Sequence, residues 1–216
     1  MYIAIEGVIG VGKTTLARLL QPCFQSVLLL EVFEENPFLS DFYADRERYA
    51  FQTQIFFLLS RYQQQRHAVH DILASDERLI SDYTFEKDAL FARINLKGDE
   101  LEMYNRVHEA LEEKLPKPDL IVYLRADPGV LMQRISSRDR SYERNMEPAY
   151  IEQLHAVYED FFRDGNQGTA VLTVDTDPLD YVKNPAHLKY IENRIRQALQ
   201  LPPFQVELPL ETVLSD

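Results

Sequence analysis

The feature that most constrains this chain lies at its start, where a short apolar run leads into a glycine-rich loop. Residues 2–6 are apolar and β-favouring, and residues 7–14 follow with the pattern Gly-x-x-x-x-Gly-Lys-Thr, the phosphate-binding P-loop. Backbone N–H groups can wrap phosphate oxygens only where side chains leave room and positive φ is tolerated. Residues 14–20 then have a helical pattern, and a helix N-terminus offers further N–H groups. The sequence therefore predicts binding of ATP or GTP.

The residue types of this loop predict separate roles at the nucleotide. We expect Lys13 to reach the β- and γ-phosphates and Thr14 to bind Mg²⁺. The other expected nucleotide-binding residues of the loop are Gly7, Gly10, Val11, Gly12 and Thr15.

Length, charge and cysteine content limit the classes of protein. The 216 residues suit a single domain, which we expect over 1–200 with a tail at 201–216. The net charge of −12 argues against nucleic acid or an anionic membrane as the main partner, because both repel an acidic surface. A single cysteine, Cys23, fits a reducing compartment, and no apolar run is long enough to cross a bilayer. We expect a soluble cytoplasmic protein.

Short apolar segments of β type alternate with helical stretches along the chain. Such alternation indicates an α/β fold, a parallel sheet with helices on both faces. The five expected strands are residues 2–6, 27–31, 78–82, 119–124 and 170–175. Beyond the helix at 14–20, the expected helices are 45–74, 99–115, 128–137, 148–163 and 184–199.

Carboxylates end several of these strands, at the edge where open α/β sheets bind ligands. Asp82 ends the third strand and has the pattern of an acid that holds Mg²⁺ in P-loop enzymes; the alternative is a turn or helix-capping aspartate. Glu31 ends the second strand and could accept a proton from an attacking hydroxyl; the alternative is a solvated strand-end glutamate.

A basic cluster stands out in the acidic chain. Arg134, Arg138, Arg140 and Arg144 fall within eleven residues. Phosphoryl transfer depends on positive charge around the migrating group, and an arginine-rich lid at about 134–147 would supply it while excluding water. The alternative is a solvated helix end with acidic neighbours.

These motifs, in this order, resemble those of the deoxynucleoside kinases, which share the fold of the nucleoside monophosphate kinases. Residues 6–15 look like the family P-loop, and residues 31–39 are similar to its Glu-Pro-Val motif in the bacterial purine-kinase form. The resemblance implies ATP as the phosphate donor, with Glu31 as the general base for the 5′-hydroxyl.

A further match implies a substrate helix. By this match Tyr43 holds the sugar 3′-hydroxyl, Gln54 pairs with the base, and Arg61 sits at the base edge. Phe91 resembles the aromatic residue that stacks on the base, and Asp88 the aspartate that partners such an arginine. The alternative for Tyr43, Gln54 and Arg61 is an ordinary amphipathic helix face.

The resemblance also covers the lid and the end of the last strand. Arg134, Arg138 and Arg140 have the family's phosphate-binding spacing, and Glu143 resembles the glutamate that assists Tyr43. Asp177, in the segment 177–180, resembles a residue of the loop that contacts the adenine of ATP. The residues expected to act in catalysis are Lys13, Glu31, Arg134 and Arg138.

One departure from the family pattern concerns the acid after the third strand. The family usually has an arginine next to it, which helps to bind the 5′-hydroxyl, whereas Tyr83 follows Asp82 here. We expect Lys87 to supply the missing charge.

The resulting prediction is a homodimeric deoxynucleoside kinase that acts on a purine substrate, deoxyadenosine or deoxyguanosine. The resemblance leaves cytosine open as an alternative base, because family members with a pair such as Arg61 and Asp88 can also accept it. A nucleoside monophosphate kinase of the thymidylate type is the first alternative, but it must hold an acceptor phosphate. A nucleotide-dependent switch is the second, and the guanine-binding loops Asp-x-x-Gly and Asn-Lys-x-Asp do not occur in the sequence.

Overall fold

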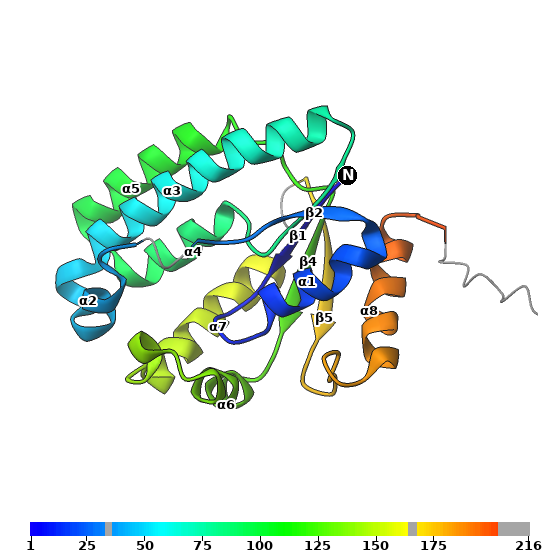
Figure 1. The fold of residues 1–216 in the computed structure, drawn as a ribbon. Helices are drawn as coiled ribbons and strands as arrows, with labels where there is room; N and C mark the ends of the chain where they lie inside the picture. Colours follow the sequence, from blue (N-terminus) through cyan, green and yellow to red (C-terminus); the bar gives the residue numbers. More distant parts are fainter. Residues whose placement is uncertain (33–35, 164–167, 203–216) are drawn as a thin grey trace, which may run out of the picture.

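A five-stranded parallel sheet forms the centre of the computed structural model, which describes residues 1–32, 36–163 and 168–202. The strand order is β2-β3-β1-β4-β5 (Figure 1). The strands are β1 (Tyr2–Glu6), β2 (Ser26–Leu29), β3 (Arg78–Ser81), β4 (Leu120–Arg125) and β5 (Ala170–Asp175).

The central strands are buried on both faces, as their continuous apolar sequences predict. All of β1 is buried, and so is β4 up to Leu124. Ala4 of β1 is aligned with Ser81 of β3 on one side and with Ile121 of β4 on the other. The carboxyl ends of β1, β3 and β4 therefore meet at one edge of the sheet, where the P-loop begins.

Helices cover both faces of the sheet (Figure 1). Helices α1 and α8 pack together on one face, while α4 and α7 lie on the other with the long α3 and its neighbour α5 beyond them. The helices are α1 (Lys13–Phe24), α2 (Leu39–Ala44), α3 (Arg46–Ala74), α4 (Glu86–Asn95), α5 (Gly98–Glu112), α6 (Pro128–Arg138), the 3₁₀ turn η2 (Ser141–Glu143), α7 (Pro148–Arg163) and α8 (Pro185–Ala198).

The predicted fold class is confirmed, with corrections to several elements. Strands β2 and β3 end before Glu31 and Asp82, so both carboxylates lie in the segments beyond the strands. Helices α2 and α4 and the turn η2 were not predicted. Helix α2 has only 6 residues, too few for a clear periodicity. Helix α4 buries Lys87 and Asp88 beside Leu90, which hides its apolar face in the sequence.

Two regions named by the sequence fall partly outside the described residues. These are the tail at 201–216, described only to residue 202, and the motif at 31–39, of which residues 33–35 are not described. Within the described part of the chain, no helix is long and apolar enough to cross a membrane.

Candidate active site

The P-loop turns directly from β1 into α1, as its sequence pattern predicts. Gly12 has φ 106° at the N-cap of α1, a conformation that side chains disfavour. A Cβ atom at Gly12 would also clash with the hydroxyl of Tyr181. That hydroxyl donates to the carbonyl oxygen of Val11 at 3.3 Å. Glycine is therefore required at position 12 for two reasons. Its backbone has a positive φ, and the Tyr181 hydroxyl occupies the space that a Cβ atom would need.

The lysine of the P-loop is folded back on the loop's own carbonyls. Lys13 Nζ donates to the oxygens of Gly7 at 2.6 Å and Val8 at 3.2 Å. Burial, and then the positive charge of Lys87, lower the pKa of Lys13 to about 8, although three nearby carboxylates oppose this effect. An anion that binds in the loop would favour the protonated form of Lys13 and so raise its pKa.

The two residues predicted to hold Mg²⁺ are adjacent. The Thr14 hydroxyl donates to Asp82 Oδ2, and Asp82 Oδ1 accepts from the backbone N–H of Glu31 at 2.8 Å. A hydroxyl and a carboxylate oxygen are ligands that Mg²⁺ prefers. Thr14 and Asp82 therefore offer suitable oxygen ligands for the ion. Their hydrogen bonds also connect the start of α1 to the segment after β2.

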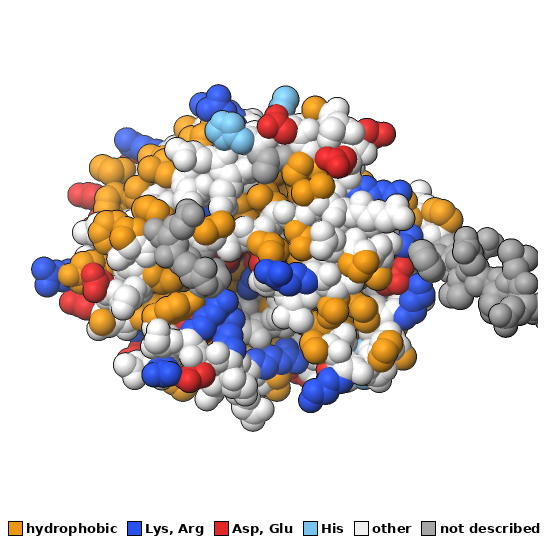
Figure 2. All heavy atoms as spheres, in the orientation of Figure 1, with side chains coloured by type: hydrophobic (Ala, Val, Ile, Leu, Met, Phe, Trp, Pro, Cys, Tyr) orange, Lys and Arg blue, Asp and Glu red, His pale blue; other side chains and the backbone are white. Residues whose placement is uncertain are grey.

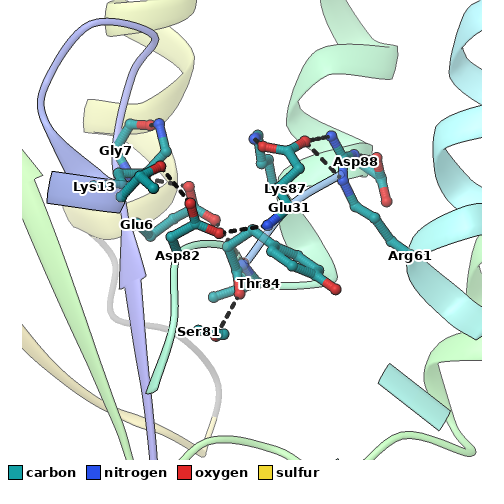
Figure 3. A network of polar contacts seen from close by, with 12 residues as sticks. Glu6, Gly7, Lys13, Glu31, Arg61, Ser81, Asp82, Thr84, Lys87 and Asp88 are labelled. Carbon is teal, nitrogen blue, oxygen red and sulfur yellow. Dashed lines mark hydrogen bonds and ion pairs between the residues drawn. The ribbon is translucent and has the colours of Figure 1, made fainter. Parts of the chain in front are cut away.

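A buried network of charges joins Glu31 to the predicted base-recognition residues (Figure 3). Arg61 Nε lies 3.1 Å from Glu31 Oε1, and its Nη1 forms an ion pair with the fully buried Asp88. Lys87 Nζ lies 2.6 Å from Glu31 Oε2. Two cations and two anions are thus paired in a largely buried environment, where breaking one pair leaves an uncompensated charge.

This network determines the protonation of Glu31. Burial alone would raise the pKa of the Glu31 carboxyl, but the charges and hydrogen bonds of Arg61 and Lys87 outweigh burial and hold the pKa well below its usual range. Glu31 is therefore an anion at neutral pH, in the form that a proton acceptor requires.

A cavity of about 110 Å³ lies between the P-loop, α3, α4 and the segment 138–143. Gln54 is almost fully buried on its wall, at a helical spacing from Phe57 and Arg61 that puts all three on one face of α3. Figure 2 shows Lys and Arg side chains gathered near the middle of one face of this acidic protein. The predicted site residues that line the cavity are Gly10, Lys13, Thr14, Glu31, Tyr43, Gln54, Arg61, Asp82, Lys87, Phe91, Arg138, Arg140 and Glu143.

Two arginines of the predicted lid line the cavity and lie against one carboxylate. Arg138 binds Glu143 through Nε at 2.8 Å and Nη2 at 2.6 Å, and Arg140 Nη1 lies 3.7 Å from the same carboxylate. The Tyr43 ring stacks on Tyr142 of η2 with centroids 6.0 Å apart. The turn η2 therefore packs against Tyr43, the residue predicted to hold the sugar 3′-hydroxyl.

Not every predicted site residue lines the cavity. Asp88 is fully buried beside Arg61 and does not reach it. The others that do not line it are Gly7, Val11, Gly12, Thr15, Arg134 and Asp177.

Arg134 does not line the cavity; its Nη1 donates to the oxygen of Val11 at 3.3 Å and to Thr176 Oγ1 at 3.0 Å. Asp177 accepts from the backbone N–H of Asp127 at 3.1 Å. Both residues join the end of β5 to neighbouring loops, and neither role follows from sequence spacing.

Several residues of the site were missed in the sequence. Phe57, whose ring lies 4.6 Å from the Arg61 guanidinium, could have been found from its spacing on α3. Glu6 could have been noticed as the one charged residue of a buried apolar strand. Nothing in the sequence points to Tyr181, because its partner Val11 is distant along the chain.

A second, larger hollow of about 680 Å³ lies beside the cavity. It is bordered by the start of α3, the C-terminal end of α4 and the start of α7, and Tyr43 is its one predicted site residue. The smaller cavity, and not this hollow, brings the P-loop and the charged network together.

The geometry on its own describes a P-loop facing a cavity that is lined by more basic than acidic side chains. A sequence model described as "Deoxynucleoside kinase" matches residues 3–200. The chain belongs to the deoxynucleoside kinase family. This membership confirms the predicted phosphotransferase activity toward a deoxynucleoside and favours it over a monophosphate kinase or a switch.

Curated deoxynucleoside kinases are similar over most of the chain. A deoxyguanosine kinase of Bacillus subtilis (strain 168) is 36% identical over 92% of this chain and 97% of its own length. A deoxyadenosine kinase of Dictyostelium discoideum is 32% identical over 81% of this chain and 71% of its own length.

Solved structures of the family agree with the fold. A deoxyadenosine kinase from M. mycoides with bound dCTP superposes with a TM-score of 0.78 at 28% identity, covering 91% of this chain and 100% of that chain. The same enzyme with products dCMP and dCDP gives a TM-score of 0.80. The predicted P-loop kinase fold is thereby confirmed.

Proposed function

We propose that this chain transfers the γ-phosphoryl group of ATP to the 5′-hydroxyl of a purine deoxynucleoside. The observation that carries the proposal is the buried link from Glu31 through Arg61 to Asp88. Glu31, the proposed proton acceptor, and Arg61, a proposed base-recognition residue, line the same cavity as Lys13 and Thr14, and the fully buried Asp88 pairs with Arg61.

In this proposal the donor binds at the P-loop and the lid. Lys13 and the loop N–H groups hold the β- and γ-phosphates, while Arg138 and Arg140 stabilise the charge of the transferring group. Thr14 and Asp82 would hold Mg²⁺, which supplies charge neutralisation between the phosphates when bound. Arg134 contributes by fixing the P-loop at Val11, and Asp177 belongs to the loop beside the adenine.

In this proposal the acceptor, a deoxynucleoside, occupies the part of the cavity that α3 and α4 line, with Glu31 between it and the P-loop. The Glu31 carboxylate takes the proton of the 5′-hydroxyl as the phosphoryl group arrives, and Lys87 supplies the charge that the family's missing arginine would provide. Tyr43 and Glu143 read the sugar, and Phe91 stacks on the base.

Base selection is assigned to Gln54, Arg61 and Asp88. An amide with both a donor and an acceptor, next to a guanidinium–carboxylate pair, suits the mixed edge of a purine. Relatives named as deoxyguanosine and deoxyadenosine kinases support a purine substrate.

We infer further properties from the sequence. One domain spans 1–200 with a lid at about 134–147, and the single cysteine, Cys23, favours the cytoplasm. Homodimer formation through the neighbouring helices α3 and α5 is supported by Leu59 and Met103, large apolar side chains that are 44% and 56% exposed.

A coupled assay of ADP release tests the proposed activity. Purified protein with Mg²⁺–ATP is given deoxyadenosine, deoxyguanosine, deoxycytidine, thymidine and the corresponding monophosphates in separate reactions. Turnover on a purine deoxynucleoside supports the proposal. Turnover confined to the monophosphates contradicts it, because the acceptor site would then have to hold a phosphate.

A further inference from the structure

Glu6, the last residue of β1, is a fully buried carboxylate to which the mechanism above gives no part. Four hydrogen bonds converge on its two oxygens (Figure 3 shows Glu6 beside Gly7 and Thr84). Oε1 accepts from the N–H of Gly7 at 3.0 Å and from the Tyr158 hydroxyl at 3.2 Å. Oε2 accepts from Thr84 N at 2.9 Å and Thr84 Oγ1 at 3.0 Å.

The partners of Glu6 come from three separate parts of the site. Gly7 is the first residue of the P-loop. Thr84 lies between Asp82 and the start of α4, the helix that carries Lys87 and Asp88. Tyr158 belongs to α7, the helix that follows the lid, and its side chain is fully buried. One carboxylate thus joins the donor loop, the acceptor segment and the helix that follows the lid.

Burial of the Glu6 carboxylate has an energetic cost that its hydrogen bonds must offset. Burying a carboxylate is costly unless its oxygens are fully hydrogen-bonded, and the four hydrogen bonds that the described residues give Glu6 all come from uncharged groups. An apolar residue at the end of β1 would avoid this cost, but it could not hold the two backbone N–H groups together.

We propose that Glu6 is a positioning residue for phosphoryl transfer, which fixes the P-loop and the segment 84–88 in a single register so that the donor phosphate and the acceptor hydroxyl face each other. The inference rests on the proposed function, and it assigns Glu6 no contact with either substrate. Alignment of this kind has large effects on rate, since a displacement of about 1 Å can cost about 100-fold.

Substitutions at Glu6 and at its partners test the inference. Glu6→Gln keeps the shape but turns one acceptor oxygen into an NH₂ group that faces two donors. Thr84→Val and Tyr158→Phe each remove one hydroxyl from the carboxylate and keep the inference testable if Glu6→Gln does not fold. Thr84→Ser restores a hydroxyl as the conservative variant.

Tyr123→Phe is the matched control. The Tyr123 ring stacks near Tyr158, with centroids 6.2 Å apart, and its hydroxyl donates at 2.8 Å to Glu159 of the same helix α7. Tyr123→Phe therefore removes a tyrosine hydroxyl that binds a carboxylate beside Tyr158, without removing a hydrogen bond from Glu6.

The readouts are the single-turnover transfer rate with both substrates saturating and the dissociation constant of each substrate alone. We expect Glu6→Gln to lower the transfer rate by at least about tenfold while each dissociation constant stays within about threefold of wild type. Thr84→Val and Tyr158→Phe should lower the rate severalfold, and Thr84→Ser and Tyr123→Phe should match the wild type.

Two results would overturn the inference. One is an unchanged transfer rate in folded Glu6→Gln or in both partner variants. The other is a loss of rate matched by equal weakening of both dissociation constants, which is the signature of a purely structural role. The acceptor used is whichever deoxynucleoside or monophosphate the wild type phosphorylates. Failure of the proposed function would thus appear in the wild type, and failure of this inference only in the variants.

Discussion

Lys87 Nζ lies 2.6 Å from Glu31 Oε2, and both side chains are largely buried at the cavity wall. This contact puts a cation beside the proposed proton acceptor in a chain where Tyr83 occupies the position of the family's usual arginine. Lys87 reaches Glu31 from α4, a helix that the sequence pattern did not reveal.

Lys87→Met is expected to lower kcat by about 10- to 100-fold, because the variant removes a charge that orients Glu31 and stabilises the transferring group. The dissociation constant for ATP should change little. Steady-state kinetics measure both quantities, and Lys97→Met, an exposed lysine just beyond α4, is the control. Activity of Lys87→Met within about threefold of wild type would exclude this role.

Arg61→Met should lower the free energy of unfolding by about 3 kcal/mol, because Asp88 would lose its ion pair while fully buried. Adding Asp88→Leu to this variant should recover most of the stability without restoring activity on a purine deoxynucleoside. Urea denaturation measures the stabilities, with the exposed Arg66→Met on the same helix as control. A double variant no more stable than Arg61→Met would contradict the assigned pairing.

Tyr181→Phe should weaken ATP binding about fivefold, since one hydrogen bond to the P-loop, worth about 1 kcal/mol, is lost. Nucleoside binding should be unaffected, because Tyr181 contacts the loop at Val11 from the side away from the cavity. Fluorescence titration of each ligand tests this, with Tyr190→Phe, a half-exposed tyrosine on α8, as control. Equal weakening of both ligands would show that the loop is not held in this way.

ATP binding should become weaker and take up a proton as pH rises past about 8, the lowered pKa of Lys13 in the free protein. The sign follows from charge: phosphate favours protonated Lys13, so its pKa rises on binding, and below pH 8 the lysine is already charged. Calorimetry in buffers of different ionisation enthalpy should detect proton uptake near pH 9 and little near pH 7. Absence of uptake at the higher pH would mean that Lys13 is not perturbed.

The sequence predicted the sheet and the P-loop well, because both depend on local pattern. Continuous apolar runs specify buried parallel strands, and the loop requires its glycines whatever surrounds it. The side chains that face the cavity from α2 and α3 were also predictable, since Tyr43 of α2 and Gln54 and Arg61 of α3 matched a family motif and line one cavity.

The contacts between distant segments could not be predicted. Glu6 binds Thr84 and Tyr158 across 78 and 152 positions of sequence, and no local pattern encodes such pairs. The position of Arg134 differs from the predicted one for the same reason. Its spacing fits an arginine of the predicted lid, but hydrogen bonds to Thr176 and Val11 hold it beside the P-loop. Tertiary partners, not residue types, decide these roles.

The most direct test of the account is single-turnover transfer from ATP to a purine deoxynucleoside by wild-type protein and Glu31→Gln. We predict that the wild type forms the 5′-monophosphate and that Glu31→Gln is slower by about 100- to 10,000-fold, with nucleoside binding within about threefold of wild type. Transfer by Glu31→Gln at the wild-type rate, or a wild type that phosphorylates only monophosphates, would contradict the account.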